Sequence, residues 1–304
     1  MHQDKLKSLA LYFLLPRPGA ITGGAIYFWG GIAYGVAQSH HFSVVDIAVA
    51  WLGTEFLVNQ AKYWLNDYKD AASDRLHPRK RERAAAGGDL PVKWLPALAA
   101  LRMITGIIFL LWHQPKMLPL ALLLPAIQLW YDTVKRLPLL NAGVAASGSV
   151  VRFAAGLCAI TGVWPLFFPC LLVYCQRLAI YVASYSAEGR YLLRYGKTPG
   201  KEYTLFYAQH PYLEKLAVAL FLGLLVFALG RSIPGGIIII GIVVVFLGVL
   251  YYRINGPGDR VYWQGWKLLW ATCAFVSRQL SEQFRLKYRQ RFLSQRRLLC
   301  LRDG

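Results

Sequence analysis

Long apolar stretches separated by short polar breaks recur along the whole chain. A hydrocarbon core about 30 Å thick takes about 20 helical residues to cross, and each stretch is close to that length. The pattern therefore predicts an all-α, polytopic membrane helix bundle with about nine transmembrane helices. We expect them at residues 10–37, 43–67, 92–112, 117–134, 141–162, 165–186, 213–230, 233–252 and 261–277.

Basic residues are concentrated in every second polar break. They follow the second, fourth, sixth and eighth expected spans, at residues 75–83, 135–136, 190–201 and 253–260. Because cytoplasmic loops are enriched in Lys and Arg, these four breaks are expected to face the cytoplasm. The protein should then be integral to the cell membrane, plasma or inner, with this end of the bundle inside the cell.

The C-terminal tail does not fit this alternation, because nine spans would leave it outside while it is rich in arginine. Either one of the last three expected spans is wrong, or the tail is a basic amphipathic helix lying on a membrane face. We expect a transmembrane domain over residues 1–280, followed by the tail at 281–304. The side of the membrane that the tail takes stays open.

The composition agrees with a membrane protein and adds an excess of positive charge. Hydrophobic residues make up 56% of the chain, and 34 Lys and Arg stand against 15 Asp and Glu. In a membrane protein such an excess is explained first by cytoplasmic loops and anionic headgroups, and second by phosphorylated substrates. Membrane lipids and a phosphorylated small molecule are the expected partners, and nucleic acid is not. The oligomeric state stays open.

The second expected span carries polar side chains along one helix face. A charged group at membrane depth is costly unless it meets a partner or water, so this face should line a polar cavity that opens to the cytoplasmic side. The alternative is a set of structural ion pairs. The face consists of Glu55, Asn59, Lys62, Asn66, Asp70 and Ser73.

Three aspartates follow at the end of the same span. Asp67, Asp70 and Asp74 stand at i, i+3 and i+7, and so project to one side of a helix. Mg²⁺ prefers oxygen ligands and is usually held by one or two carboxylates plus substrate phosphates. We therefore expect Mg²⁺ here, nearest to Asp67 and Asp70. Asp74 lies about 10 Å from Asp67 along the axis, so it would help a second ion or orient water.

A basic loop follows the aspartates directly. Its guanidinium and ammonium groups could hold the phosphate oxygens of a substrate, or could contact lipid headgroups. The loop residues that we expect to bind phosphate are Arg75, Lys80, Arg81 and Arg83.

Further polar residues lie on other expected spans. Tyr131 and Lys135 share a helix face, where Lys135 could meet a phosphate or both could anchor the span at the interface. Arg177 lies well inside apolar sequence and needs a counter-charge, for which Glu55 is the candidate. The stretch 189–211 is long enough to hold a short helix over the cavity.

The order Asn66-Asp67-x-x-Asp70-x-x-x-Asp74 at the end of a second transmembrane helix resembles the UbiA superfamily of intramembrane prenyltransferases. The resemblance implies a Mg²⁺-dependent transfer in which the donor loses diphosphate. Other positions that look like landmarks of that family are Arg17 with Pro18, Tyr131, Lys135, and Arg152 near Gly156.

One branch of that superfamily looks closer than the rest. Members generally carry a second aspartate motif after the sixth span, whereas residues 185–191 hold a single acid, Glu188. Polyprenyl-phosphate phosphoribosyltransferases are similar at residues 74–83, at 151–156 and at the step from Ala187 to Glu188. The resemblance implies transfer of 5-phosphoribose from phosphoribosyl pyrophosphate to a polyprenyl phosphate.

Two other functions stay open. One is transfer of an isoprenyl group from a polyprenyl diphosphate to an aromatic or other lipophilic acceptor. The other is a cation-coupled transporter, although the two halves hold no matching pair of broken helices. In the transferase reading, Asp67, Asp70 and Asp74 are catalytic and bind metal. The residues expected to bind substrate are Lys62, Asn66, Arg75, Lys80, Arg81, Arg83, Tyr131, Lys135, Arg152 and Glu188.

Overall fold

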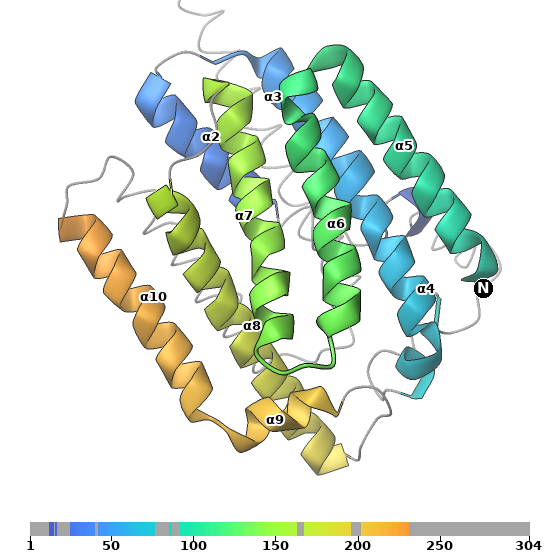
Figure 1. Ribbon diagram of the computed structural model, residues 1–304, viewed down its shortest axis with the longest axis vertical. Coiled ribbons are helices and arrows are strands. Elements are labelled where there is room, and N and C mark those ends of the chain that lie inside the picture. The colour runs from blue at the N-terminus through green and yellow to red at the C-terminus, as the bar shows by residue number, and fades with distance from the viewer. Residues whose placement is uncertain are drawn as a thin grey trace, which may run out of the picture.

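The computed structural model describes residues 12–14, 16, 25–39, 42–76, 85–86, 92–162, 167–195 and 202–230. These residues are almost entirely helical, as the sequence predicts. The helices run side by side as a bundle, and the short helix α9 lies across one end of it (Figure 1). The elements are α2 (Ile26–Ser39), α3 (Val44–Ala50), η2 (Trp51–Asn59), α4 (Gln60–Leu76), η3 (Val92–Trp94), α5 (Leu95–His113), η4 (Pro115–Met117), α6 (Leu118–Val134), α7 (Leu140–Thr161), α8 (Phe167–Tyr195), α9 (Tyr203–Gln209) and α10 (Tyr212–Gly230).

Four described helices are long and apolar enough to cross a membrane. They cover Val92–His113, Pro115–Val134, Leu140–Thr161 and Phe167–Arg194, close to four of the expected spans. A fifth span results if α9 and α10, which meet at a bend of 79°, are counted as one. The expected spans at 233–252 and 261–277 lie outside the described residues, as does the tail at 281–304. The total of nine therefore stays a prediction.

The second expected span forms one continuous helix through α3, η2 and α4. Ser43 caps its start, where the side-chain oxygen accepts a hydrogen bond from the Asp46 amide at 3.2 Å. The middle section, η2, is a π-helix, a rare form that often occurs at functional sites. The helix ends at Leu76 rather than near residue 67, where the apolar sequence ends. Its last turns are polar but still helical, and they carry Asp70 and Asp74.

Two glycines bring α2 and α7 into close contact. A Cβ atom on Gly156 would stand 1.9 Å from the Phe28 carbonyl oxygen, and one on Gly31 would stand 2.0 Å from the Phe153 carbonyl oxygen. Only glycine permits backbones to approach so closely, as is common between membrane helices. The crossing holds α7 in the middle of the bundle, where most of its residues are buried.

The C-terminal ends of α4, α6 and α8 lie at the end of the bundle where α9 also lies (Figure 1). Tyr207 of α9 fastens that helix to the α6–α7 turn. Its hydroxyl accepts a hydrogen bond from the Leu139 amide at 2.7 Å and donates one to Asn141 at 2.5 Å. Leu139 has a φ of 69°, which is unfavourable for a branched residue, so the turn depends on such contacts.

The helix α9 (Tyr203–Gln209) confirms the short helix that we expected between residues 189 and 211.

We predict that Gly156→Ala lowers the stability of the folded bundle by about 1–3 kcal/mol, because the new methyl group must displace backbone. Gly223→Ala is the matched control, since a Cβ at Gly223 meets nothing within 4 Å. Unfolding in mixed detergent micelles measures both variants. Equal stability of the two would contradict the close crossing.

Candidate functional site

A buried ion pair joins η2 to α7. The Arg152 guanidinium donates through Nε to Glu55 Oε1 at 2.6 Å and through a terminal nitrogen to Glu55 Oε2. Asn59 also donates to Oε2, at 3.0 Å. The Arg152 and Glu55 side chains are 4% and 0% exposed. We expected Glu55 to pair with Arg177, and this was wrong, because Arg152 on the central helix holds both carboxylate oxygens.

The three aspartates of α4 lie at the polar end of the bundle, and all three are buried. Asp67 accepts a hydrogen bond from the Tyr12 hydroxyl at 2.9 Å. Asp70 accepts one from Lys135, at the C-terminal end of α6, at 2.6 Å. We call Asp67, Asp70 and Asp74 with the adjoining Lys135 the acidic end.

The carboxylates of the acidic end are directed to different neighbours. Asp67 turns to Tyr12 and Asp70 turns to α6, where Lys135 stands. Among the described residues, no group of three or more His, Cys, Asp or Glu side chains is placed to hold a metal ion. This donor set does not form an all-protein metal cage. It fits an ion that is bound by one or two carboxylates and completed by a phosphorylated ligand.

A second ion pair fixes α4 against α6 at this end. Lys69 lies 2.6 Å from Asp132, whose other oxygen accepts a hydrogen bond from Gln128 at 3.0 Å. The sequence analysis did not single out Asp132, although an acid inside an otherwise apolar span was a usable signal. With the bond from Lys135 to Asp70, this pair determines how the last turns of α4 face α6.

Tyrosines from three helices meet beside Asp70 and Lys135. Tyr131 of α6, one turn before Lys135, has its hydroxyl 3.0 Å from that of Tyr185 on α8. The Tyr203 ring of α9 stands edge-on to Tyr185, with 5.6 Å between centroids. Tyr185 and Tyr203 were not singled out for binding. The signal for Tyr185 is the spacing of residues 177, 181, 185 and 188 along one face of α8, whereas Tyr203 lies on α9 and has no such signal.

The remaining expected site residues differ in where they lie. Lys62, Asn66 and Glu188 are partly accessible, and Asn66 is 3.4 Å from Asp70. Arg75 is directed to the Ala86 carbonyl at 3.0 Å. Arg190 donates hydrogen bonds to Ser186 and Glu214. The expected residues outside the described part of the chain are Lys80, Arg81, Arg83 and Arg17 with Pro18.

The model of the UbiA prenyltransferase family matches residues 25–260, more than half of the chain. The chain belongs to the UbiA prenyltransferase family. This membership makes it a membrane protein and a UbiA-type transferase, in line with the resemblance carried by Asn66, Asp67, Asp70 and Asp74.

Two curated relatives are each called decaprenyl-phosphate phosphoribosyltransferase. The one from Corynebacterium glutamicum is 32% identical over 117 residues, which are 38% of this chain and 35% of the relative. The one from Mycolicibacterium smegmatis is 30% identical over 95 residues, which are 31% of this chain and 30% of the relative. The similarity thus spans about a third of the length of these relatives.

Solved structures of UbiA proteins share the fold. A UbiA homolog from Archaeoglobus fulgidus bound to DMAPP and Mg²⁺ superposes with a TM-score of 0.60 at 14% identity, over 84% of this chain and 98% of that one. A digeranylgeranylglyceryl phosphate synthase gives a TM-score of 0.52 at 16% identity, over 90% and 96%. At such identities the likeness concerns the fold.

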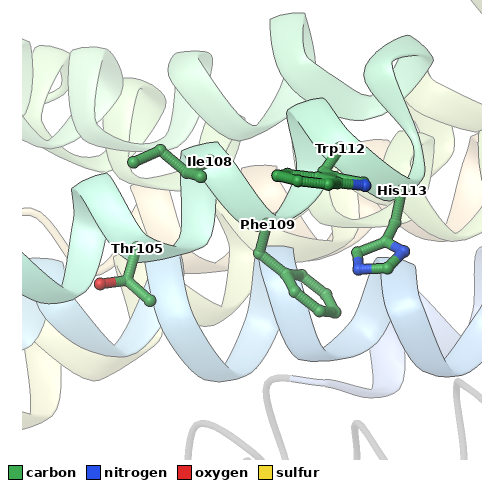
Figure 2. A pocket seen from close by; sticks show the side chains of 5 residues that line it. All are labelled: Thr105, Ile108, Phe109, Trp112 and His113. Carbon is green, nitrogen blue, oxygen red and sulfur yellow. The ribbon is translucent and has the colours of Figure 1, made fainter.

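An open hollow on α5 is separate from this site. Figure 2 shows its lining, which comes entirely from one stretch of α5: Thr105, Ile108, Phe109, Trp112 and His113. Most of these side chains are exposed, and Trp112 is 83% exposed. On a membrane helix, such a surface faces lipid or another helix. It contributes no group to the acidic end.

We predict that Glu55→Ala destabilises the protein by about 3–5 kcal/mol, because Arg152 keeps a buried charge without its partner. The double replacement of Glu55 and Arg152 by Ala should restore part of this loss. Lys69→Ala breaks a more exposed pair and should cost less than about 1 kcal/mol. If Glu55→Ala cost no more than Lys69→Ala in the same unfolding assay, the ion pair would not be a structural anchor.

Proposed function

We propose that this UbiA-type transferase moves 5-phosphoribose from phosphoribosyl pyrophosphate to a polyprenyl phosphate. The observation that carries the proposal is the pair of relatives called decaprenyl-phosphate phosphoribosyltransferase. It is supported by the chain itself, because the part of α8 that faces Tyr131 holds Glu188 in place of a second row of aspartates.

The proposed reaction balances without an added acid or base. An oxygen of the lipid phosphate forms a bond to C1 of the ribose, while the bond from C1 to the diphosphate breaks and its electron pair leaves with the diphosphate. The developing cation at C1 reacts with water, so the membrane bundle must limit water around it. The tyrosines at positions 131, 185 and 203 form the aromatic wall beside the acidic end.

Mg²⁺ is the proposed cofactor. Asp67 and Asp70 would hold it together with the donor diphosphate, which supplies the remaining oxygens. Bound there, the ion would neutralise charge that develops on the leaving diphosphate. Lys135, now 2.6 Å from Asp70, has the charge and position to contact the same diphosphate. Arg75, Lys80, Arg81 and Arg83 are proposed to hold other donor phosphate oxygens, with Asn66 and Glu188 orienting the sugar.

The proposed function also includes an orientation of the protein in the membrane. The transferase domain occupies residues 1–280 with nine spans, the acidic end opens to the cytoplasm, and the tail at 281–304 is a separate basic segment. The membrane is the plasma or inner membrane, where a water-soluble donor reaches the acidic end from the cytoplasm.

An alternative is transfer of an isoprenyl group to an aromatic or other lipophilic acceptor. It is favoured by the solved UbiA homologs from Archaeoglobus fulgidus, which are bound to DMAPP or GPP with Mg²⁺. An allylic diphosphate would use the same metal site, because it also leaves as diphosphate. The two functions differ in whether the substrates carry a phosphate monoester.

We predict that purified protein with Mg²⁺ and polyprenyl phosphate transfers label from phosphoribosyl pyrophosphate into the lipid-extractable fraction. A parallel mixture contains a labelled prenyl diphosphate and an aromatic acid. Label in lipid only in the second mixture would reject the phosphoribosyl assignment and favour the alternative.

The same assay tests the acidic end. Asp67→Asn or Asp70→Asn should lower kcat/KM by about 100-fold or more, because each change weakens the binding of the metal that stabilises the leaving group. Asp46→Asn is the control, since Asp46 belongs to the same continuous helix but lies at its opposite end. Equal activity of all three variants would remove the metal site from the acidic end.

A further inference from the structure

Two cations deep in the bundle have no acidic partner among the described residues. Arg177 lies on α8, where its guanidinium stacks near the rings of Tyr181 and Tyr27, at 4.5 and 5.5 Å from their centroids. It donates one long hydrogen bond, to the Tyr181 hydroxyl at 3.3 Å, and its buried Nε has no partner. Lys62 lies on α4 and has its ammonium 5.2 Å from the centroid of the Tyr63 ring.

These cations lie close to the Glu55–Arg152 pair. The Lys62 ammonium is 3.9 Å from the place that a Cβ of Gly148 would take, one helical turn before Arg152 on α7. Arg177 and Arg152 are close enough to repel each other electrostatically. We call Lys62, Arg152 and Arg177 the inner cation group. Glu55 already binds Arg152 through both oxygens, so no acid in the described part of the chain matches the positive charges of Lys62 and Arg177.

Arg102 differs from Arg177 in its terminal nitrogens, although the Nε of each arginine lacks a hydrogen-bond partner among the described residues. The two terminal nitrogens of Arg102 donate to the carbonyl oxygens of Phe13 and Phe56, at 3.1 and 2.7 Å. Its guanidinium also stacks near the rings of Phe56 and Trp64. Arg177 has the rings, but no carbonyl partner among the residues that the structure describes. A cation–π contact compensates only part of the cost of a charge at membrane depth, so an anion at Arg177 would be favourable.

Partly accessible residues lie between the inner cation group and the acidic end. Along α4, Lys62, Tyr63 and Asn66 are partly accessible, and so are Arg177, Tyr181 and Ser184 along α8. These residues lead from the inner cations toward Asp70 and Glu188. Lys62 and Asp70 are eight residues apart, about 12 Å along the helix axis. One diphosphate cannot contact both places, so the inner cations serve a second anionic group.

We propose that Lys62 and Arg177, with the hydroxyl of Tyr181, form a phosphate-monoester subsite distinct from the diphosphate site at the acidic end. The inference rests on the proposed function for its ligands, because both proposed substrates carry such a group: the polyprenyl phosphate and the 5-phosphate of the donor. A phosphate monoester brings a charge of about −2, which matches the two unmatched cations. A prenyl diphosphate with an aromatic acceptor has no phosphate monoester to place there.

The test measures binding without turnover, in nanodiscs of neutral lipid with Mg²⁺ removed. One arm compares polyprenyl phosphate with polyprenol, and the other compares ribose 5-phosphate with ribose. In one arm, the wild-type protein should bind the phosphorylated ligand more tightly than the unphosphorylated one. Arg177→Gln should reduce this ratio of Kd values about 10-fold or more. The arm that responds identifies whether the lipid or the soluble donor supplies the phosphate.

Two further variants separate binding from folding. Arg177→Lys keeps the positive charge but loses the planar guanidinium group. Its preference for the phosphorylated ligand should therefore lie between those of wild type and Arg177→Gln. Arg102→Gln removes a partly buried arginine whose two terminal nitrogens already donate to backbone carbonyls, and should keep the wild-type preference for the phosphorylated ligand. If Arg177→Gln kept the preference in both arms, or if Arg102→Gln lost it equally, the subsite would be refuted. Phosphoribosyl transfer by wild-type protein, measured separately, decides the proposed function independently.

Discussion

The buried pair between Glu55 and Arg152 is the interaction on which the arrangement of charges in this bundle depends. An ionised group inside a membrane bundle must be matched by another charge, by dipoles or by water. Arg152 comes from the central helix α7, and Glu55 comes from the π-helical section of the long second helix. Their contact joins these helices at one depth, and the α2–α7 crossing fixes α7 against the opposite neighbour.

Because Glu55 is fully engaged, the charges on either side of the pair have separate roles. Toward the end of the bundle, α4 presents three buried aspartates beside Lys135. Deeper in the bundle, Lys62 and Arg177 carry positive charge that the described residues do not neutralise. The substrates of the proposed reaction match this order, because the donor carries a diphosphate and both donor and acceptor carry a phosphate monoester.

The positions of several helices can be predicted from the sequence, whereas the partners of the buried charges cannot. Apolar runs predict helices at 92–112, 117–134 and 141–162, close to α5, α6 and α7, because membrane spans need long apolar sequence. The charge of Arg177 predicts that it needs a partner. Its pairing with Glu55 was wrong, because Glu55 and Arg152 are 97 positions apart and only the packing of α7 brings them together.

At the acidic end, too, some features could be predicted from the sequence and others could not. Helical spacing places Asp67, Asp70 and Asp74 near one another on α4, and family resemblance suggests their chemistry. The contacts of Asp67 with Tyr12 and of Asp70 with Lys135 depend on how separate helices pack. Residue spacing along one helix does not contain that information. The link from Tyr207 to the Leu139 turn likewise depends on tertiary contacts, so sequence periodicity does not predict it.

The acidic end and the inner cation group are proposed to bind a diphosphate and a phosphate monoester of one transfer reaction. A cryo-EM structure in nanodiscs, with Mg²⁺, polyprenyl phosphate and an unreactive analogue of phosphoribosyl pyrophosphate, tests this proposal most directly. We expect density for a metal and a diphosphate at Asp67 and Asp70, and for a phosphate monoester beside Lys62 and Arg177. A diphosphate bound at Lys62 and Arg177, with no metal at the aspartates, would contradict it.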